Sequence, residues 1–403
     1  MGVMNITTYG FTLLSARLLG PEEYSALAAV MGLLLVVNVL SLGLQATGAR
    51  RVSSSPETLP EIEHEVMGSS YRSALALGLI CLVAAPAVKA ILNLDSLAAT
   101  ALIAVTAVPL TVMGGQAGLL QGERRWTPLA LIYLGVGVGR IGFGAVALMI
   151  SPTMAAAMVG VALGALVPFV VGWLALRHPG RRQPKVHMPH LAGARWAPGG
   201  VLRETAHNSH ALLAFFALSN ADVIIARSVL PEHKAGLYAG GLILAKAVLF
   251  LPQFVVVMVF PSMSRRPDSR RMNLLALGVV AAIGACVVVG VLVLSGTAVT
   301  FVGGPEYSPL ESRIWLFAIV GTLLAMIQLL VYSVVARQHQ RAVYTIWAAL
   351  AVLACAAPFV TSWPFLVGVV LTVDSTLFLV LLLLSLRRAG SPVSAMKEPT
   401  PAT

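Results

Sequence analysis

Long apolar stretches alternate with short polar connections along the whole chain, and this pattern predicts twelve membrane-spanning helices. The predicted spans are residues 3–19, 25–47, 73–92, 97–120, 127–150, 154–176, 206–229, 235–262, 273–296, 313–336, 342–361 and 364–386. Most are close to the roughly 20 residues that a helix needs to cross a hydrocarbon core of about 30 Å. Only helices suit such spans, because backbone polar groups in lipid must be bonded within the segment. The predicted fold class is an all-α polytopic membrane protein.

The basic residues fall on alternate connections, and this supports the count of spans. Of the 27 Lys and Arg residues, twenty lie in the even-numbered connections and the C-terminal tail, and five lie in the odd-numbered ones. The remaining two, Arg140 and Lys246, lie inside spans. Cytoplasmic loops of membrane proteins carry the excess of basic residues. Both termini are therefore predicted to face the cytoplasm.

Composition agrees with a membrane protein and excludes several other classes. Hydrophobic residues make up 58% of the chain and charged residues 11%, whereas a soluble domain is about a quarter charged. The net charge of +11 gathers on one face, where anionic lipid headgroups attract it, so no nucleic-acid partner is expected. Cys81, Cys286 and Cys355 lack metal or disulfide spacing, and neither a metal nor a cofactor is expected.

Two segments recur in the second half of the chain and predict an internal repeat. Ala16–Glu22 closes the first span and resembles Ala226–Glu232, which closes the seventh. Gln121–Arg125 joins the fourth and fifth spans, and Arg337–Arg341 joins the equivalent tenth and eleventh spans. Parallel repeats imply two six-helix lobes related by a pseudo-two-fold axis along the membrane normal, with a cavity between them near the midplane.

The repeat divides the chain into four predicted parts. Residues 1–176 form the N-terminal six-helix lobe and residues 206–388 the C-terminal six-helix lobe. Between them, residues 177–205 are basic and rich in Pro and Gly, which is typical of a cytoplasmic linker. Residues 389–403 are predicted to be a disordered cytoplasmic tail. The connections on the outer side are too short for a catalytic domain, so we do not expect an enzyme.

Several short motifs resemble a known family in the order and spacing in which they occur. Ala16–Tyr24 is similar to the opening of bacterial polysaccharide-exporting flippases, the Wzx-type members of the MOP (multidrug/oligosaccharidyl-lipid/polysaccharide) superfamily. Ala221–Ala239 resembles the start of that family's second lobe, Phe260–Arg265 its next cytoplasmic boundary, and Phe301–Tyr307 its outward loop before the tenth helix.

The resemblance implies a two-lobed transporter that flips polyprenyl-diphosphate-linked oligosaccharide from the inner to the outer leaflet by alternating access. The implied location is the bacterial inner membrane. The implied partners are the lipid-linked saccharide and membrane lipids, together with glycosyltransferases or a polymerase of the same pathway. The alternatives are a drug or ion exporter of the same superfamily, a polytopic glycan polymerase or ligase, and a flippase-like scaffold.

Two cations inside spans are the strongest candidates for substrate binding. Ionisable residues at this depth are costly and usually face a cavity or a partner. Arg140 shares a helical face with Tyr133, and Lys246 shares one with Gln253. A guanidinium and an ammonium would both suit a diphosphate. The alternatives are an ion pair of Arg140 with Asp374 and, for Lys246, snorkelling toward the headgroups.

Two carboxylates inside spans are candidates for ion coupling. Asp222 lies in the seventh span and Asp374 in the twelfth. A carboxylate within the membrane is suited to binding a coupling ion or a proton. The alternative for each is an ion pair with Arg140, Lys246 or Arg227.

Neutral polar residues inside spans are candidates for contacts with sugar hydroxyls. These residues are Asn38, Gln45, Gln116, Asn220 and Gln328. Hydrogen bonds between helices are an equally good interpretation.

Two further features are expected to be structural. Arg17 and Arg227 occupy equivalent places near the outer surface and are expected to anchor their helices at the membrane interface, with substrate contact on release as the alternative. Gly137–Gly142 matches a dinucleotide-binding fingerprint, but it lies in a predicted transmembrane helix, where glycines favour helix packing.

Overall fold

The protein is a helical bundle in every part that the structure, a computed structural model, describes: residues 2–177, 200–249, 269–336 and 340–387. The helices of the first half are α1 (Gly2–Val37), α2 (Val39–Ser54), α3 (Leu59–Ile91), α4 (Leu97–Gly122), α5 (Trp126–Ile150) and α6 (Met154–Arg177). Those of the second half are α7 (Val201–Val229), α8 (Glu232–Leu249), α10 (Ser269–Val293), α11 (Ser295–Val302), α12 (Ile314–Ala336), α13 (Gln340–Ala356) and α14 (Trp363–Arg387). Short 3-10 turns lie at η1 (Pro56–Thr58), η3 (Pro305–Leu310) and η4 (Ala357–Phe359). The all-α prediction is confirmed.

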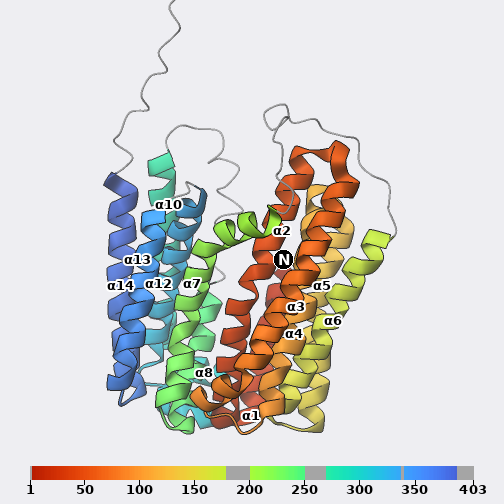
Figure 1. Ribbon diagram of the computed structural model, residues 1–403. Helices are drawn as coiled ribbons and strands as arrows, with labels where there is room; N and C mark the ends of the chain where they lie inside the picture. The colour runs from red at the N-terminus through yellow and green to blue at the C-terminus, as the bar shows by residue number, and fades with distance from the viewer. Residues whose placement is uncertain (1, 178–199, 250–268, 337–339, 388–403) are drawn as a thin grey trace, which may run out of the picture.

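The helices form two lobes (Figure 1). Those coloured red to yellow-green, α1–α6, gather on one side of the picture, and those coloured green to blue, α7–α14, on the other. In the first lobe α3 packs against α4 and α5 against α6, and in the second α12 packs against α10 and α14. Contacts between the lobes come mainly from α1 with α7 and α8, and from α2 with α7. The predicted two-lobe architecture is confirmed.

The first two predicted spans belong to one helical segment that contains a break. Ten helices in the described ranges are long and apolar enough to cross a membrane, and Gly2–Ser54 is counted as one of them. Within it, Gly20 has a φ of 69° and a ψ of 175°, which glycine adopts readily, and Pro21 follows. The segment therefore supplies two spans. The described helices therefore match eleven of the predicted spans, and α8 matches the described part of the remaining one, residues 235–262.

Two helices begin earlier than their apolar spans. α3 begins at Leu59, and the charged Glu61 occupies its first turn; α7 begins at Val201, with Glu204 in its first turn. Acidic residues in a first turn favour helix formation through the helix dipole. Polar helical turns of this kind carry no hydropathy signal, which explains the difference from the predicted boundaries.

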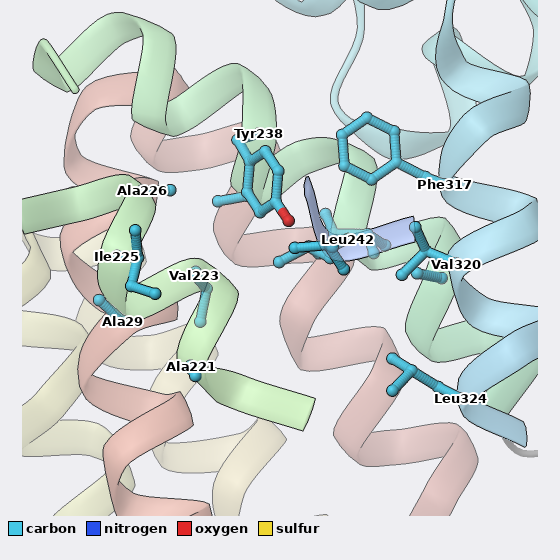
Figure 2. Packing of buried hydrophobic residues seen from close by; sticks show 14 of the residues in the cluster. Ala29, Ala221, Val223, Ile225, Ala226, Tyr238, Leu242, Phe317, Val320 and Leu324 are labelled. Carbon is cyan, nitrogen blue, oxygen red and sulfur yellow. The ribbon is translucent and has the colours of Figure 1, made fainter. Parts of the chain in front are cut away.

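The principal apolar core crosses the boundary between the lobes. Ala29 of α1 belongs to the same buried cluster as Val223 of α7, and Figure 2 shows both in the α1–α7 contact. In the second lobe, the rings of Tyr238 and Phe317 meet edge to face, with centroids 5.3 Å apart (Figure 2). Gly32 of α1 lets the helices approach, because a Cβ there would lie 3.1 Å from Val223. Close packing of small residues is how membrane helices associate.

Basic side chains gather at one end of the bundle, which we name the arginine-rich end. Arg50 and Arg51 lie near the C-terminus of α2, Arg124 and Arg125 in the α4–α5 turn, and Arg177 at the C-terminus of α6. Contacts confirm that these elements meet, since Arg125 donates to the carbonyl oxygen of α6 residue Ala175 over 2.7 Å. The other end of the bundle contains the break at Gly20, the α3–α4 turn and η3.

Candidate functional site

Arg140 lies near the middle of α5, half-buried, on the side that adjoins α1. Two glycines bring these helices together: a Cβ at Gly137 would lie 3.0 Å from Met4, and one at Gly10 would lie 3.4 Å from Ile141. No described residue forms a hydrogen bond or an ion pair with the Arg140 guanidinium. Its donors are therefore available to a ligand.

Lys246 lies in α8 and is only partly satisfied. Its Nζ atom donates to the side-chain oxygen of Asn220 over 3.2 Å, and Asn220 in turn donates to the carbonyl oxygen of Phe216 over 2.8 Å. An ammonium has three donors, so two remain without an acceptor among the described residues. The α8 helix is held beside α1 by Tyr9, whose hydroxyl donates to the carbonyl oxygen of Ile243 over 3.3 Å.

These two cations flank the same section of α1, one from each lobe. α1 packs against both α5 and α8. Its contacts with α5 involve Met4 and Gly10, and its bond to α8 involves Tyr9. Arg140 lies within one turn of the α5 contacts, and Lys246 lies one turn beyond the α8 contact. The structure thus places a positive charge on each side of α1 at a similar depth.

Asp222 is a buried carboxylate held by two hydrogen bonds. It is 2% exposed, accepts from the backbone N–H of Val223 over 2.8 Å, and accepts from the Tyr238 hydroxyl over 3.0 Å. Lys246 interacts with it electrostatically without forming an ion pair. Sequence analysis did not identify Tyr238 as a partner. The sequence signal for Tyr238 is its place after Pro231–Glu232, which matches the place of Tyr24 after Pro21–Glu22.

Asp374 is the second buried carboxylate of this group. It is 2% exposed, its Oδ2 atom has no hydrogen-bond partner among the described residues, and Asp222 is its electrostatic neighbour. The alternative ion pairs of these carboxylates with Arg140 or Arg227 do not occur in the described ranges. The second lobe thus holds two buried carboxylates, Asp222 and Asp374, together with Lys246.

A second polar group lies in the first lobe. The side chain of Gln45 donates to the Gln121 side-chain oxygen over 2.8 Å and to the Tyr133 hydroxyl over 2.5 Å. Tyr133 is seven residues before Arg140 on the same face of α5, about 10 Å along the helix axis. The chain of hydrogen bonds thus runs from the arginine-rich end toward Arg140.

Other predicted site residues lie apart from these groups. Gln116 is fully buried inside the first lobe, and its amide has no described partner. Gln328 is buried in α12 and donates to Tyr332 over 3.0 Å. Asn38 lies at the junction of α1 and α2, with a buried and unpartnered Oδ1 atom. Gln253 falls outside the described residues.

Arg227 joins the two lobes at the end opposite the arginine-rich end. It is 4% exposed and donates to three acceptors of the first lobe: the carbonyl oxygens of Leu92 (3.0 Å) and Asn93 (2.9 Å), and the hydroxyl of Ser25 (2.9 Å). It also pairs with Glu232 of its own lobe at 2.7 Å. The predicted anchoring at the membrane interface is therefore wrong for Arg227, because its guanidinium is buried between protein groups.

Arg17 makes the reciprocal contact. Its guanidinium, which is exposed, donates to the carbonyl oxygen of Thr300 in the second lobe over 3.1 Å. Thr300 lies in α11, shortly after α10, and Leu92 lies directly after α3. The repeated arginines therefore cross between the lobes in equivalent ways, as expected for the internal repeat.

No three His, Cys, Asp or Glu side chains gather as metal ligands in the part of the chain that the structure describes. The chemistry available at the site is instead that of charge pairing: an unpartnered guanidinium, a partly satisfied ammonium and two buried carboxylates. Such groups bind anions and monovalent cations or protons.

A two-lobed bundle of membrane-spanning helices with ionisable groups inside the spans is an arrangement typical of secondary transporters. The chain belongs to the family of polysaccharide biosynthesis proteins, whose family model matches residues 1–266. No curated protein matches the sequence.

Solved structures share the fold at low sequence identity. An inward-facing multidrug resistance MATE family transporter of the MOP superfamily has a TM-score of 0.70 at 10% identity, over 96% of this chain and 94% of that one. A eukaryotic MATE transporter has a TM-score of 0.65 at 14% identity, over 95% and 93% of the two chains. A MOP superfamily transporter from Pyrococcus furiosus, described as having a binding pocket of reverse polarity, has a TM-score of 0.58 at 12% identity, over 96% and 93%.

Proposed function

We propose that this protein flips a polyprenyl-diphosphate-linked oligosaccharide from the inner to the outer leaflet by alternating access of its two lobes. The observation that carries the proposal is the placement of Arg140 and Lys246 on either side of α1 with donors available. A diphosphate offers several anionic oxygen atoms, and charge-assisted hydrogen bonds to them are strong. Membership in the polysaccharide biosynthesis family supports a glycan as the cargo.

The remaining polar residues fit the other parts of such a substrate. Asn220 presents an amide beside Lys246, and Gln45 and Tyr133 present amide and hydroxyl groups between the arginine-rich end and Arg140. These groups are suited to sugar hydroxyls. The lipid tail would stay in the bilayer while the charged head passes between the lobes.

The alternation of basic loops supports a single orientation of the protein. The arginine-rich end would face the cytoplasm of the bacterial inner membrane, because basic loops remain on that side. Residues 177–205 and the tail from 389 would lie on the same side, between and after the two lobes. Glycosyltransferases and a polymerase of the pathway would deliver and consume the substrate.

Asp222 and Asp374 are proposed to couple transport to an ion gradient. Two buried carboxylates favour a bound proton or cation, because their like charges repel when both are bare. Occupancy of this pair would change the charge beside Lys246 and so its attraction for the diphosphate.

Drug export is the second candidate function, and the fold favours it, since the structural neighbours include multidrug MATE transporters. The two functions make different demands on charge. An unpartnered guanidinium attracts anions and repels cationic drugs, so the site as built favours the lipid-linked saccharide.

The test is a leaflet-transport assay in proteoliposomes with polyprenyl-diphosphate oligosaccharide. Arg140→Ala and Lys246→Ala should insert and fold but transport at least about tenfold more slowly, because each removes charge-assisted bonds to the diphosphate. Arg140→Lys should recover only part of the rate, since a point charge lacks the bidentate geometry. Lys234→Ala, an exposed lysine at the start of the same helix as Lys246, is the matched control and should transport normally. Parent rates in both alanine variants would remove the basis of the proposal.

A further inference from the structure

A cavity of about 510 Å³ opens at the arginine-rich end of the first lobe, outside the site described above. Its lining comes from the end of α2 and from the α4–α5 turn: Ala49, Arg50, Ser53, Gln121, Arg124 and Trp126. We name it the vestibule. Its volume lies within the range of about 300–1,000 Å³ of small-molecule sites.

Two guanidiniums supply the charge of the vestibule. Arg124 is exposed, and no described residue accepts a hydrogen bond from it or pairs with it. The neighbouring Glu123 pairs instead with Arg125, whose Nη1 atom lies 3.6 Å from Glu123 Oε2. Arg50, on the facing helix, pairs with Glu204 of α7. A phosphate between Arg50 and Arg124 would receive donors from both sides.

The backbone at Arg124 is held in an unfavourable conformation. Its φ is 59°, and only Asn93 shares a positive φ among the non-glycine residues described. Residues other than glycine rarely adopt this backbone conformation, and strained backbone conformations cluster at binding sites. The turn thus presents Arg124 to the cavity at a conformational cost that a glycine at this position would avoid.

Hydrogen bonds link the vestibule to the polar group of the first lobe. Gln121, which lines it, accepts from Gln45, and Gln45 donates to Tyr133. Tyr133 lies two turns before Arg140 on α5. Hydrogen-bonded polar groups therefore run from the surface cavity as far as Tyr133, about 10 Å along the α5 axis from Arg140.

We propose that the vestibule is the entry subsite where the diphosphate-sugar head of the substrate docks from the inner leaflet before it reaches Arg140. This rests on the proposed function. The phosphate would bind Arg50 and Arg124, and the flat indole of Trp126, which is 56% exposed, would pack against a sugar ring. Because Arg50 now pairs with Glu204 of the other lobe, docking competes with a contact between the lobes. A phospholipid headgroup has the same phosphate chemistry and is the rival occupant.

The experiment measures binding by titration calorimetry with the full chain in phosphatidylcholine nanodiscs. The probes are inorganic pyrophosphate and geranyl diphosphate carrying one N-acetylglucosamine. Arg124→Ala should weaken both probes by about tenfold, the effect of one charge-assisted hydrogen bond. Glu204→Gln should tighten both, because it releases Arg50. Arg177→Ala, an equal loss of charge at the same end, should change neither.

Two results would overturn the proposal. Equal weakening by Arg124→Ala and Arg177→Ala would reduce the effect to general surface charge. If the parent and Arg124→Ala bind the probes with equal affinity in nanodiscs that contain 30% phosphatidylglycerol, the vestibule is assigned to lipid headgroups.

Leaflet transport separates this proposal from the proposed function. If both hold, Arg124→Ala raises the substrate concentration for half-maximal transport about tenfold and leaves the maximal rate unchanged. Transport by Arg124→Ala that equals the parent at low substrate overturns the vestibule alone. Absence of transport in the parent, with pyrophosphate binding still weakened by Arg124→Ala, overturns the proposed function and the substrate assignment while a phosphate site remains.

Discussion

Under the proposed alternating access, replacing Arg227 with alanine should shift the equilibrium between the two access states. Opening the lobes at this end breaks the bonds of Arg227 to Leu92, Asn93 and Ser25 but keeps its pair with Glu232. Hydrogen bonds to a charged group contribute about 1.5–3 kcal/mol each, and bonds that share one guanidinium are not additive. We therefore assign about 3 kcal/mol to the three cross-lobe bonds together, which corresponds to roughly a hundredfold change in the equilibrium.

Labelling of a buried cysteine measures this shift. Ala235 is 1% exposed and precedes Gly236, where a Cβ would collide with Pro21 of the first lobe. A cysteine at Ala235, in a chain whose three native cysteines are replaced, should react with an impermeant maleimide only when the lobes open at this end. Arg227→Ala should raise its labelling rate by up to about a hundredfold.

Two matched variants sharpen the test. Arg17→Ala removes the repeat-related arginine, which is exposed, so its cross-lobe bond contributes less and labelling should rise only a few-fold. Glu232→Gln removes a half-exposed partner within the second lobe and should leave labelling close to the parent. If Arg227→Ala and Glu232→Gln label equally, the cross-lobe bonds do not hold this end closed and the reasoning is refuted.

Three further predictions follow from the described contacts. Tyr238→Phe should lower the free energy of unfolding by about 1.5–3 kcal/mol, because it removes the hydrogen bond to the buried Asp222 carboxylate. Tyr307 is equally buried, but its hydroxyl donates to the carbonyl oxygen of Ala16 over 3.4 Å. Tyr307→Phe should therefore lower the free energy of unfolding by less in the same denaturation assay. Asp374→Asn should fold as the parent does, since its Oδ2 atom has no partner among the described residues, yet lose the dependence of transport on a proton or sodium gradient; retained dependence would make the carboxylate structural. Cysteines at Ser53 and Ser308, both exposed, should be labelled from opposite sides of the membrane, and labelling from one side would contradict the topology.

Much of the fold was predictable because the membrane imposes a simple code. Hydropathy and the alternation of basic loops predicted the twelve spans, and the first boundary falls where Gly20 and Pro21 break α1. The early start of α3 at Leu59 was not predictable in this way, because helical turns in water need no apolar run. Their charged residues resemble those of a loop.

The sequence predicted only part of the site, because hydrogen-bond acceptors that belong to the backbone cannot be recognised from residue types. A lone cation inside a span, such as Arg140 or Lys246, stands out in the sequence because it is costly there. The cross-lobe role of Arg227 did not stand out, since its acceptors include the backbone carbonyls of Leu92 and Asn93, which leave no mark in a sequence. The vestibule likewise depends on the turn conformation at Arg124.

The central claim is that the cargo is a lipid-linked saccharide, and competition in one reconstituted system tests it most directly. Proteoliposomes of the parent chain receive a labelled polyprenyl-diphosphate oligosaccharide in one leaflet. A cationic dye is added on one side of the membrane, either in the lumen or outside. The account predicts movement of the saccharide between leaflets, dependent on Arg140, with no transport of the dye. Dye transport that persists in Arg140→Ala, together with a saccharide that stays in its original leaflet, would contradict the account and favour drug export.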